Sequence, residues 1–399
     1  MTTRGTFRGD DINMQHSAFA RFHWLFLAVL IVALCAPNLF GQVPAPTQQQ
    51  PQLPPGAPPA GAPPARVQPP AYNCEPVNPN ATPEARALLK TLCALSGNGI
   101  LTGQHNFPND LSQHSDKVFE TTGKYPAVWG SDFGFLDGED KDSIIHRDRM
   151  IEEAKKQAAA GSIITLCWHM LRPTEDEPAP AGENGRPSPA WRGSVQARLT
   201  DEQWMELITS DSPLHQRWEK YMDTAAGFLK QLQDANVPVL WRPMHENNGN
   251  FFWWGGRPGA YGTQQLYREL YNRMVNVHHL NNLIWVWNQN GPAPGGEFYS
   301  YFPGQQYVDV VSYDNYRELS DRYYHEILTI ANGKPIALGE LGAPPSPEVL
   351  KSQPRWVWFM TWAGMGGPPG REERLKEAYT NPYFINRGDP LPVPVPKQP

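Results

Sequence analysis

The sequence lacks the features that mark metal-dependent, nucleotide-binding or nucleic-acid-binding proteins. Only four of its 399 residues are cysteines, and no spacing of cysteine and histidine resembles a zinc site. It contains no glycine-rich dinucleotide-binding loop and no Gly-x-Ser-x-Gly motif, which argues against a dehydrogenase or a serine hydrolase. The 34 lysines and arginines are balanced by 40 aspartates and glutamates without any run of like charge, so no phosphate-neutralising surface is indicated. We therefore expect no nucleic-acid partner, no metal and no organic cofactor.

The sequence also lacks an apolar run as long as the ~20 residues that a transmembrane helix needs. The apolar run at residues 24–36 instead has the length of the core of an export signal, and it follows a basic stretch. We predict that residues 1–42 are a signal peptide, cleaved near Gly41. The mature chain would then be secreted or periplasmic, without stable membrane insertion. The alternative is a retained membrane anchor, which the long and only mildly basic amino-terminal stretch favours.

Prolines gather near both ends of the chain. Residues 44–71 contain 11 prolines among alanine, glutamine and glycine, a composition that buries little apolar surface and favours extended segments. We predict a proline-rich linker at residues 43–72 and a proline-rich tail at residues 389–399. Residues 73–388 are left as a single catalytic domain, and the hydrophobic fraction of 40% is sufficient for a large core.

Three cysteines belong to the predicted mature chain, an odd number that forbids complete pairing. Cys74 and Cys93 flank a predicted helix at the start of the folded region, and in an exported protein they could form a disulfide. Cys167 lies in an apolar run, which favours a buried free thiol.

Aromatic residues are numerous, with 14 tryptophans, 15 tyrosines and 16 phenylalanines. Aromatic faces cover the apolar face of a sugar ring well, but the same residues can also form a tryptophan-rich core. Composition alone favours the core slightly.

Short apolar runs rich in β-branched and aromatic residues alternate with stretches of helical character, the pattern of repeated βα units. The predicted helices include residues 148–160 and 214–235, the second with apolar residues at helical spacing. Eight near-continuous apolar strands alternating with helices predict an α/β fold, the closed parallel (β/α)8 TIM barrel. The eight runs are residues 99–105, 125–135, 162–169, 238–246, 283–290, 308–316, 335–342 and 357–363.

Almost every run ends in polar residues that a core would not choose. In a (β/α)8 barrel the carboxyl ends of the strands point into one shared active-site cup. A single polar residue at a strand end is usually a cap or an ion-pair partner, but seven converging strand ends predict a site. The residues concerned are Gln104, His105, Asp132, Trp168, His169, His245, Glu246, Asn288, Asp314, Asn315, Tyr316 and Glu340.

Two glutamates end the fourth and seventh runs. A retaining glycosidase needs two carboxyl groups roughly 5 to 5.5 Å apart, one as nucleophile and one as acid and base. Glu246 and Glu340 can supply this pair from opposite sides of the barrel mouth. The alternative for either glutamate alone is an ion pair, with Arg242 or Arg317 as partner.

The chain resembles a known family at these positions. One segment is similar to the acid/base segment of glycoside hydrolase family 26, whose best-known members are endo-β-1,4-mannanases: residues 241–255, WRPMHENNGNFFWWG. The resemblance runs from about Gly99, through LTGQH at residues 101–105 and ALGELG at residues 337–342, to Trp362. It implies a (β/α)8 barrel with catalytic glutamates after strands four and seven, in agreement with the strand count above.

The resemblance implies roles for individual residues. Glu246 would be the acid/base and Glu340, in its Glu-x-Gly context, the nucleophile. His245 would bind the sugar next to the scissile bond, and an imidazole there can donate to a sugar hydroxyl or to the nucleophile. Tyr316 would donate a hydrogen bond to the nucleophile and keep it ionised, and Asp314 would lie nearby.

Two more residues match the sugar pocket of the family. His169 resembles the histidine after the third strand, and Trp362 resembles the aromatic floor beneath the sugar at the cleavage point. Each has an alternative: His169 could be a hydrogen-bonded core histidine, Trp362 could fill the barrel, and Asp314 could cap a loop.

Further aromatic residues are candidates for contact with substrate. Phe251 stands where the family more often has tryptophan, so it would stack more weakly on the leaving-group sugar. Trp129 and Trp253 are weaker candidates. Because Trp253 and Trp254 are adjacent, we expect only one of them to face the cleft and the other to pack.

These residues predict a secreted retaining endo-β-1,4-mannanase that cleaves mannan-type polysaccharides by double displacement. Two departures from typical mannanases, Ala363 after Trp362 and the sequence of residues 285–290, keep open a mixed-linkage β-glucanase or a β-1,3-xylanase. A non-catalytic carbohydrate-binding barrel is a third alternative. The presence of both Glu246 and Glu340 argues against it, because a binding protein needs neither.

Overall fold

A computed structural model describes residues 74–134, 146–174, 195–291, 298–363 and 370–391. They all belong to one structural unit, residues 66–399. The predicted signal peptide, the whole of the predicted linker and most of the predicted tail lie outside the described residues.

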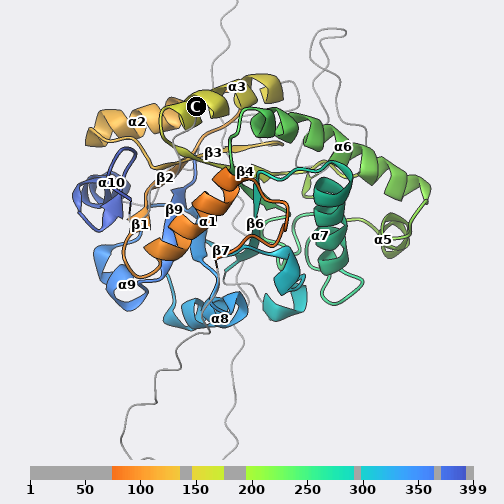
Figure 1. The fold of residues 1–399 in the computed structure, drawn as a ribbon. Coiled ribbons are helices and arrows are strands. Elements are labelled where there is room, and N and C mark those ends of the chain that lie inside the picture. Colours follow the sequence, from red (N-terminus) through yellow and green to blue (C-terminus); the bar gives the residue numbers. More distant parts are fainter. Residues whose placement is uncertain (1–73, 135–145, 175–194, 292–297, 364–369, 392–399) are drawn as a thin grey trace, which may run out of the picture. The chain divides into compact units, whose positions relative to one another are not determined.

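Eight parallel strands form a closed barrel, as the sequence predicts (Figure 1). Neighbouring strands pair in chain order from β2 to β9, and β9 returns to β2 where Gln104 pairs with Thr361. The barrel strands are β2 (Gly103–His105), β3 (Val128–Asp132), β4 (Ile163–Trp168), β5 (Val239–Pro243), β6 (Leu283–Asn290), β7 (Val310–Asn315), β8 (Ile336–Leu341) and β9 (Trp356–Thr361).

Helices surround the barrel in Figure 1. None of those in the described part of the chain is long and apolar enough to cross a membrane. They are α1 (Pro83–Leu95), α2 (Gln113–Thr122), α3 (Arg147–Ala159), α5 (Asp201–Leu207), α6 (Pro213–Asp234), α7 (Thr263–Asn272), α8 (Asp321–Ala331), α9 (Pro347–Ser352) and α10 (Arg371–Thr380). A π-helical turn, Arg273–Val277, extends α7, and two 3-10 turns occur at Phe298–Tyr301 and Gln305–Tyr307.

Several helices begin at a Ser-Pro or Thr-Pro pair that fixes their first turn. The hydroxyls of Thr82, Ser212 and Ser346 accept hydrogen bonds from backbone N–H groups of α1, α6 and α9, and a proline follows each as the first helical residue. The hydroxyl satisfies a free N–H group, and proline presets the helical φ angle, so each pair specifies where its helix starts.

Alternation along the strands decides which side chains enter the barrel. Successive side chains of a strand point to opposite faces, so every second residue faces inward. One hydrophobic cluster joins residues in the first halves of the strands: Leu101, Val128, Leu240, Ile284, Val286, Val310, Ala337 and Val357. Their sequence neighbours, such as Trp129, Trp241 and Trp285, belong to the outer core between strands and helices. The barrel interior is therefore apolar at the amino-terminal ends of the strands.

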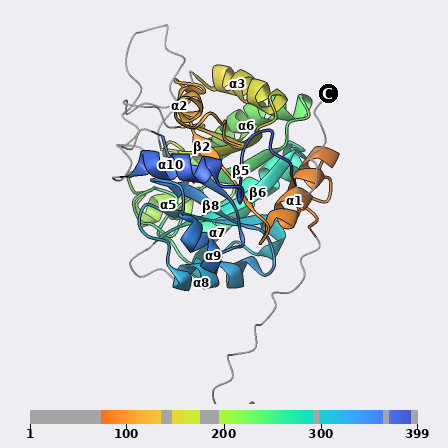
Figure 2. The same cartoon turned by 90° about the vertical axis from the view of Figure 1, so that its left-hand side faces the viewer.

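Helix α1 closes that apolar end. Its buried face, including Leu88, Leu92 and Leu95, belongs to the same cluster as the strand beginnings. Figures 1 and 2 show α1 lying across one end of the barrel, outside the ring of the other helices. A disulfide between Cys74 and Cys93 ties the preceding segment to this helix, and Cys167 is a buried free thiol.

The first predicted strand, residues 99–105, is divided in the structure. Its first part, β1 (Ile100–Leu101), pairs with β9 and with a short strand β10 (Phe384–Ile385), whereas β2 pairs with β3 and β9. The division falls at Thr102, whose backbone bonds to Ile385 and Val128. The strand β10 was not predicted, because two residues are too few to show the apolar pattern of a strand.

Candidate active site

Three carboxylates meet at the carboxyl ends of β5, β7 and β8. Glu246 follows β5, Asp314 ends β7 and Glu340 lies near the end of β8. One carboxylate oxygen from each lies within 4.8 Å of the other two. Their exposed fractions are 8%, 0% and 4%, so all three are removed from bulk water. The sequence prediction of converging strand ends is met at these positions.

A single buried cation, Arg242 of β5, lies against two of these carboxylates. Its Nη2 donates to Glu340 Oε1 at 2.6 Å and its Nη1 donates to Asp314 Oδ2 at 2.9 Å. The ion pair considered as the alternative for Glu340 therefore exists, with Arg242 and not Arg317. It holds Glu340 in place and stabilises the ionised carboxylate, since an adjacent guanidinium favours the charged form.

No ion pair with Glu246 is found among the residues that the structure describes. Burial raises the pKa of Glu246 well above its usual range, and the nearby Glu340 and Asp314 raise it further, although Arg242 lowers it from a distance. Burial likewise raises the pKa of Asp314, against the opposing effect of Arg242. The site therefore contains a carboxyl group with a raised pKa beside a carboxylate that is bound to arginine.

An asparagine of β6 fixes the relative positions of two of the carboxyl groups. Asn288 Oδ1 accepts a hydrogen bond from the backbone N–H of Glu246 at 2.9 Å, and its Nδ2 donates to Asp314 Oδ1 at 2.7 Å. The backbone of Met244 and Glu246 is left-handed, with φ of 49° and 52°, which side chains larger than glycine rarely adopt. Such strain persists where surrounding contacts hold it, often at functional sites.

An irregularity between β7 and β8 brings Glu340 level with Asp314. Tyr313 pairs with Leu338, and Asp314 pairs with Glu340, so Gly339 is an extra residue on β8. A Cβ atom on Gly339 would lie 2.5 Å from Asp314 Oδ1, so only glycine fits there. The bulge turns Glu340 into the site.

Tyr316 contacts the same carboxylate from the loop after β7. Its hydroxyl donates to Glu340 Oε2 at 2.7 Å. Burial and the negative charge of Glu340 raise the pKa of Tyr316 well above its usual range, so the phenol remains protonated and available as a donor. This contact is the one that the family resemblance implies.

Three histidines pack together beside the carboxylates. His169 Nε2 lies 3.0 Å from His245 Nε2, and the ring of His105 stacks on Trp362 with 3.7 Å between ring centroids. His245 and His169 are 1% and 5% exposed. Both therefore support the site from beneath other side chains, and Trp362, 4% exposed, packs against His105 and His169.

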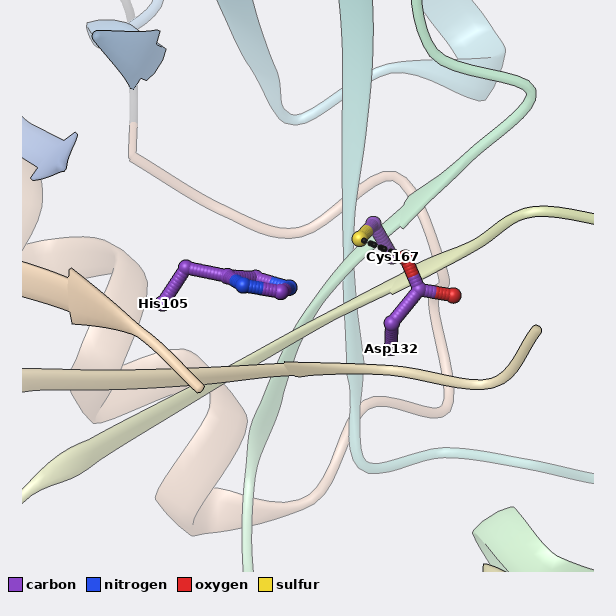
Figure 3. A group of neighbouring side chains, drawn as sticks. All are labelled: His105, Asp132 and Cys167. Carbon is purple, nitrogen blue, oxygen red and sulfur yellow. Dashed lines mark hydrogen bonds between the residues drawn. The ribbon is translucent and has the colours of Figure 1, made fainter. Parts of the chain in front are cut away.

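His105, Asp132 and Cys167 form a further buried group next to these histidines. Figure 3 shows the ring of His105 pointing toward the thiol of Cys167 and the carboxylate of Asp132. The thiol lies 3.1 Å from Asp132 Oδ2, and burial and Asp132 raise the pKa of Cys167 well above its usual range, so it is a neutral donor. Among the described residues, this group and the three carboxylates each bring three potential metal-ligating atoms within 4.8 Å of one another.

The predicted aromatic residues divide into two kinds. Phe251 is partly exposed in the loop after β5, and its ring lies 4.6 Å from that of Phe252. Trp129 and Trp253 are completely buried, and their indole N–H groups donate to Ser112 Oγ and to the carbonyl of Met170. Completely buried side chains cannot touch a substrate, so we leave Trp129 and Trp253 out of the proposed site.

The expectation that one of the adjacent tryptophans faces the cleft is not met either. Trp254 is as buried as Trp253, stacks on Phe252 at 4.4 Å and donates to the carbonyl of His245. The alternation of side chains along β3 explains why Trp129 does not enter the site. Val128 faces the barrel interior, so the next residue, Trp129, must face the helices.

Asp132 and Asn288 were predicted only as members of the converging strand ends, and Arg242 only as a possible ion-pair partner of a glutamate. All three face the barrel interior near the ends of their strands, and this position could have marked them as site residues. Their importance comes from contacts with partners on other strands, which spacing along the chain does not report.

Comparison with known proteins identifies the family of this chain. The sequence profile of Glycosyl hydrolase family 26 matches residues 77–389. The chain belongs to this family. A solved family 26 structure, GH26A from Muricauda sp., is 40% identical, with a TM-score of 0.72, and the match covers 78% of this chain and 99% of that one.

Two further relatives have names that state an activity. A mannan endo-1,4-beta-mannosidase of Thermothelomyces thermophilus is 35% identical over 320 residues, which are 77% of this chain and 61% of that protein. The structure of the Podospora anserina GH26-CBM35 beta-(1,4)-mannanase is 30% identical with a TM-score of 0.66, covering 81% of this chain and 70% of that one. The chain spans about 50% to 61% of the length of the first curated relatives that it matches.

Proposed function

We propose that this family 26 protein is a retaining endo-β-1,4-mannanase that cleaves internal bonds of mannan-type polysaccharides by double displacement. The observation that carries the proposal is the approach of Glu246 and Glu340, with carboxylate oxygens within 4.8 Å. Retaining glycosidases place their two carboxyl groups roughly 5 to 5.5 Å apart, whereas inverting enzymes leave roughly 6.5 to 9.5 Å for a water molecule.

Each glutamate has surroundings suited to its proposed role. Glu340 accepts hydrogen bonds from Arg242 and Tyr316, which favour an ionised nucleophile. Glu246 forms no ion pair among the described residues, and burial raises its pKa, so it can donate a proton to the leaving oxygen and then act as base toward water. The exchange of the two roles would inactivate the site, since a protonated carboxyl cannot attack.

The polymer is proposed from the relatives. The Thermothelomyces and Podospora proteins are named for mannan, and both match most of the folded region. We place Trp362 beneath the sugar at the cleavage point and Phe251 on the leaving-group side, with His169, His245 and Asp314 holding the surrounding geometry. No nucleic-acid partner is part of the proposal.

We also propose that the chain is exported. Residues 1–42 would be the signal peptide, residues 43–72 a spacer and residues 389–399 a tail flanking the catalytic domain. The support is the apolar run at residues 24–36 and the proline content of residues 44–71. A mature chain beginning near Gln42 in the culture medium or periplasm would support export, and a membrane-bound full-length chain would contradict it.

The first test is release of reducing ends from unsubstituted β-1,4-mannan by the mature chain, beside Glu246→Ala and Glu340→Ala. We expect activity in the parent and its loss in both variants. Mixed-linkage β-glucan and β-1,3-xylan are measured in parallel. Activity confined to one of these would overturn the mannan assignment but keep the catalytic pair, and binding without hydrolysis would overturn the enzyme.

A second test separates retention from inversion. Azide can take the place left by a shortened acid/base and attack the glycosyl-enzyme. Azide should therefore rescue Glu246→Ala on an activated aryl β-mannoside and give a β-azide. In Glu340→Ala, azide would replace the missing nucleophile and attack the substrate directly, which gives an α-azide. Formation of this product would identify Glu340 as the nucleophile. A first-formed α-anomer from the parent chain would refute retention.

A further inference from the structure

A continuous row of buried polar contacts runs from β3 to the proposed nucleophile. Asp132 Oδ2 lies 2.5 Å from His169 Nδ1, and His169 Nε2 lies 3.0 Å from His245 Nε2. His245 Nε2 is in turn 3.8 Å from Glu340 Oε1. Asp132, His169 and His245 are 0%, 5% and 1% exposed, so bulk water does not compete for these contacts.

The first proton in this row is on His169 Nδ1. Burial alone would raise the pKa of Asp132, but His169, His105 and hydrogen bonds from its neighbours outweigh burial and hold that pKa below its ordinary value. Asp132 is thus an ionised acceptor, and its partner His169 Nδ1 must be the donor.

The contact between the two Nε2 atoms holds one proton. The charged and titratable groups around the two rings are Asp132, His105, Cys167, Arg242 and Glu340. Burial lowers the pKa of His245 well below its usual range, so its ring is neutral. Glu340 Oε1, 3.8 Å from His245 Nε2, favours the shared proton on the His245 side, and a His169 with one proton, on Nδ1, accepts it at Nε2.

We propose that Asp132 is a positioning residue that fixes the tautomers of His169 and His245 and so keeps the N–H of His245 Nε2 beside Glu340. The chain of donation runs from His245 Nε2 to His169 Nε2, and from His169 Nδ1 to Asp132. The proton on His245 Nε2 lies between the bare Nε2 of His169 and the proposed nucleophile, where it stabilises the negative charge of Glu340. The consequence for catalysis rests on the proposed function, but the tautomers do not.

The contacts of Asp132 determine what an asparagine would do in its place. Asp132 Oδ1 accepts from the backbone N–H groups of Gly134, at 2.7 Å, and His169, at 3.2 Å. In Asp132→Asn the amide oxygen must occupy this position, because an NH2 group there would face two donors. The amide nitrogen then faces His169 Nδ1 and donates to it, while the thiol of Cys167, which donates to Asp132 Oδ2 at 3.1 Å, would turn to the carbonyl of Ser131 at 3.7 Å.

We expect Asp132→Asn to move the proton of each of the two histidines to its other ring nitrogen. His169 would carry its proton on Nε2 and donate to His245 Nε2, which becomes bare, and the His245 proton would move to Nδ1. A lone pair then replaces the N–H dipole beside Glu340. The shape of the site is unchanged, so the effect is electrostatic.

The decisive measurement is nitrogen-15 NMR of the histidine rings, which distinguishes protonated from bare nitrogens. We expect the wild-type chain to show His169 protonated at Nδ1 only and His245 protonated at Nε2 only, and Asp132→Asn to show both reversed. A wild-type His169 protonated on both nitrogens, or unchanged tautomers in Asp132→Asn, would overturn the proposal. The wild-type spectrum tests it even if the variant does not fold, and even if the chain hydrolyses no mannan.

Kinetics test the link to catalysis. When a reversed tautomer stops a histidine from transferring a proton directly, the rate falls by roughly 10⁴-fold. His169 and His245 would only orient other groups, so we expect kcat/KM of Asp132→Asn to be lower by roughly 10- to 100-fold. The acid limb of its pH profile should move to higher pH. Asp132→Asn should add no further loss to His169→Ala, and additive losses would contradict action through His169. Ser131→Ala, the outward neighbour on β3, is the control and should retain wild-type kinetics.

Discussion

Replacement of Gly339 by alanine tests whether the bulge on β8 positions the proposed nucleophile. The added Cβ atom would lie 2.5 Å from Asp314 Oδ1, 2.6 Å from Ser312 Oγ and 2.7 Å from Asn288 Nδ2. These three atoms already bond to one another, with Asn288 as the donor to both oxygens. None of them belongs to the free end of a flexible surface side chain, so the clash cannot be relieved cheaply.

The expected magnitude follows from these distances. Real Cβ contacts are almost never shorter than 3.0 Å, so either the three atoms or the backbone of β8 must move by at least about 0.3 to 0.5 Å. Overpacking of a buried site destabilises by about 1 to 3 kcal/mol. A 1 Å displacement of catalytic groups lowers rates by roughly 100-fold, so we expect kcat/KM to fall by roughly 10- to 100-fold.

The assay pairs urea unfolding with initial rates on mannan. Gly227→Ala is the matched control, because Gly227 lies in the middle of α6 and a Cβ there would meet nothing within 4 Å. That variant should gain about 0.5 to 1 kcal/mol from helix propensity and keep full activity. A Gly339→Ala protein as stable and active as the wild type would refute the argument that Asn288, Ser312 and Asp314 leave room only for glycine.

Three further predictions concern single contacts elsewhere in the domain. Tyr316→Phe removes the hydrogen bond to Glu340, worth about 1.5 to 3 kcal/mol for a charged acceptor, so kcat/KM should fall by roughly 10- to 150-fold while unfolding free energy changes little; unchanged kinetics would contradict the contact. Burial raises the pKa of Asp309 to about 6, above its ordinary value. Its stabilising contribution, about 3 kcal/mol, is therefore complete below about pH 4 and is lost as pH rises through 6. Asp309→Asn should abolish this part of the pH dependence of the unfolding free energy, and an unchanged pH dependence in the variant would contradict the prediction. Serine at both Cys74 and Cys93 should lower the unfolding free energy by about 3 kcal/mol, as expected for a loop of this length, without loss of kcat, and stability equal to that of the wild type in oxidising buffer would contradict the disulfide.

The barrel could be predicted because its strands are buried on both faces. Each strand is then a nearly continuous apolar run, and the parallel arrangement requires a helix between neighbours, so both signals recur eight times. The pairing of β10 with β1 could not be predicted, because Phe384–Ile385 joins the sheet through partners distant in sequence. The outward direction of Trp129 could have been read from the alternation of β3, since Val128 is an apolar inward residue.

The proposed catalytic pair was visible in the sequence because both glutamates lie at the ends of strands in recognisable segments. The support around them was not. The sequence offered Arg242 only as one of two possible ion-pair partners, and its contact with both Glu340 and Asp314 is visible only in the folded chain. The bulge at Gly339 and the left-handed backbone of Glu246 likewise depend on three-dimensional contacts, because neither changes the apolar pattern along the chain.

The junction between β2 and β9 governs how the chain can reach its native state. Gln104 and Thr361 bond through both backbone and side chain, although 257 positions separate them. A growing polypeptide cannot make this junction until nearly all of the catalytic domain has been synthesised. Until then the sheet is an open ribbon with two unpaired edges, a state prone to pairing with other chains. Folding of this protein should accordingly be slow for its size and sensitive to truncation, since loss of the final strands removes the partner that closes the ring.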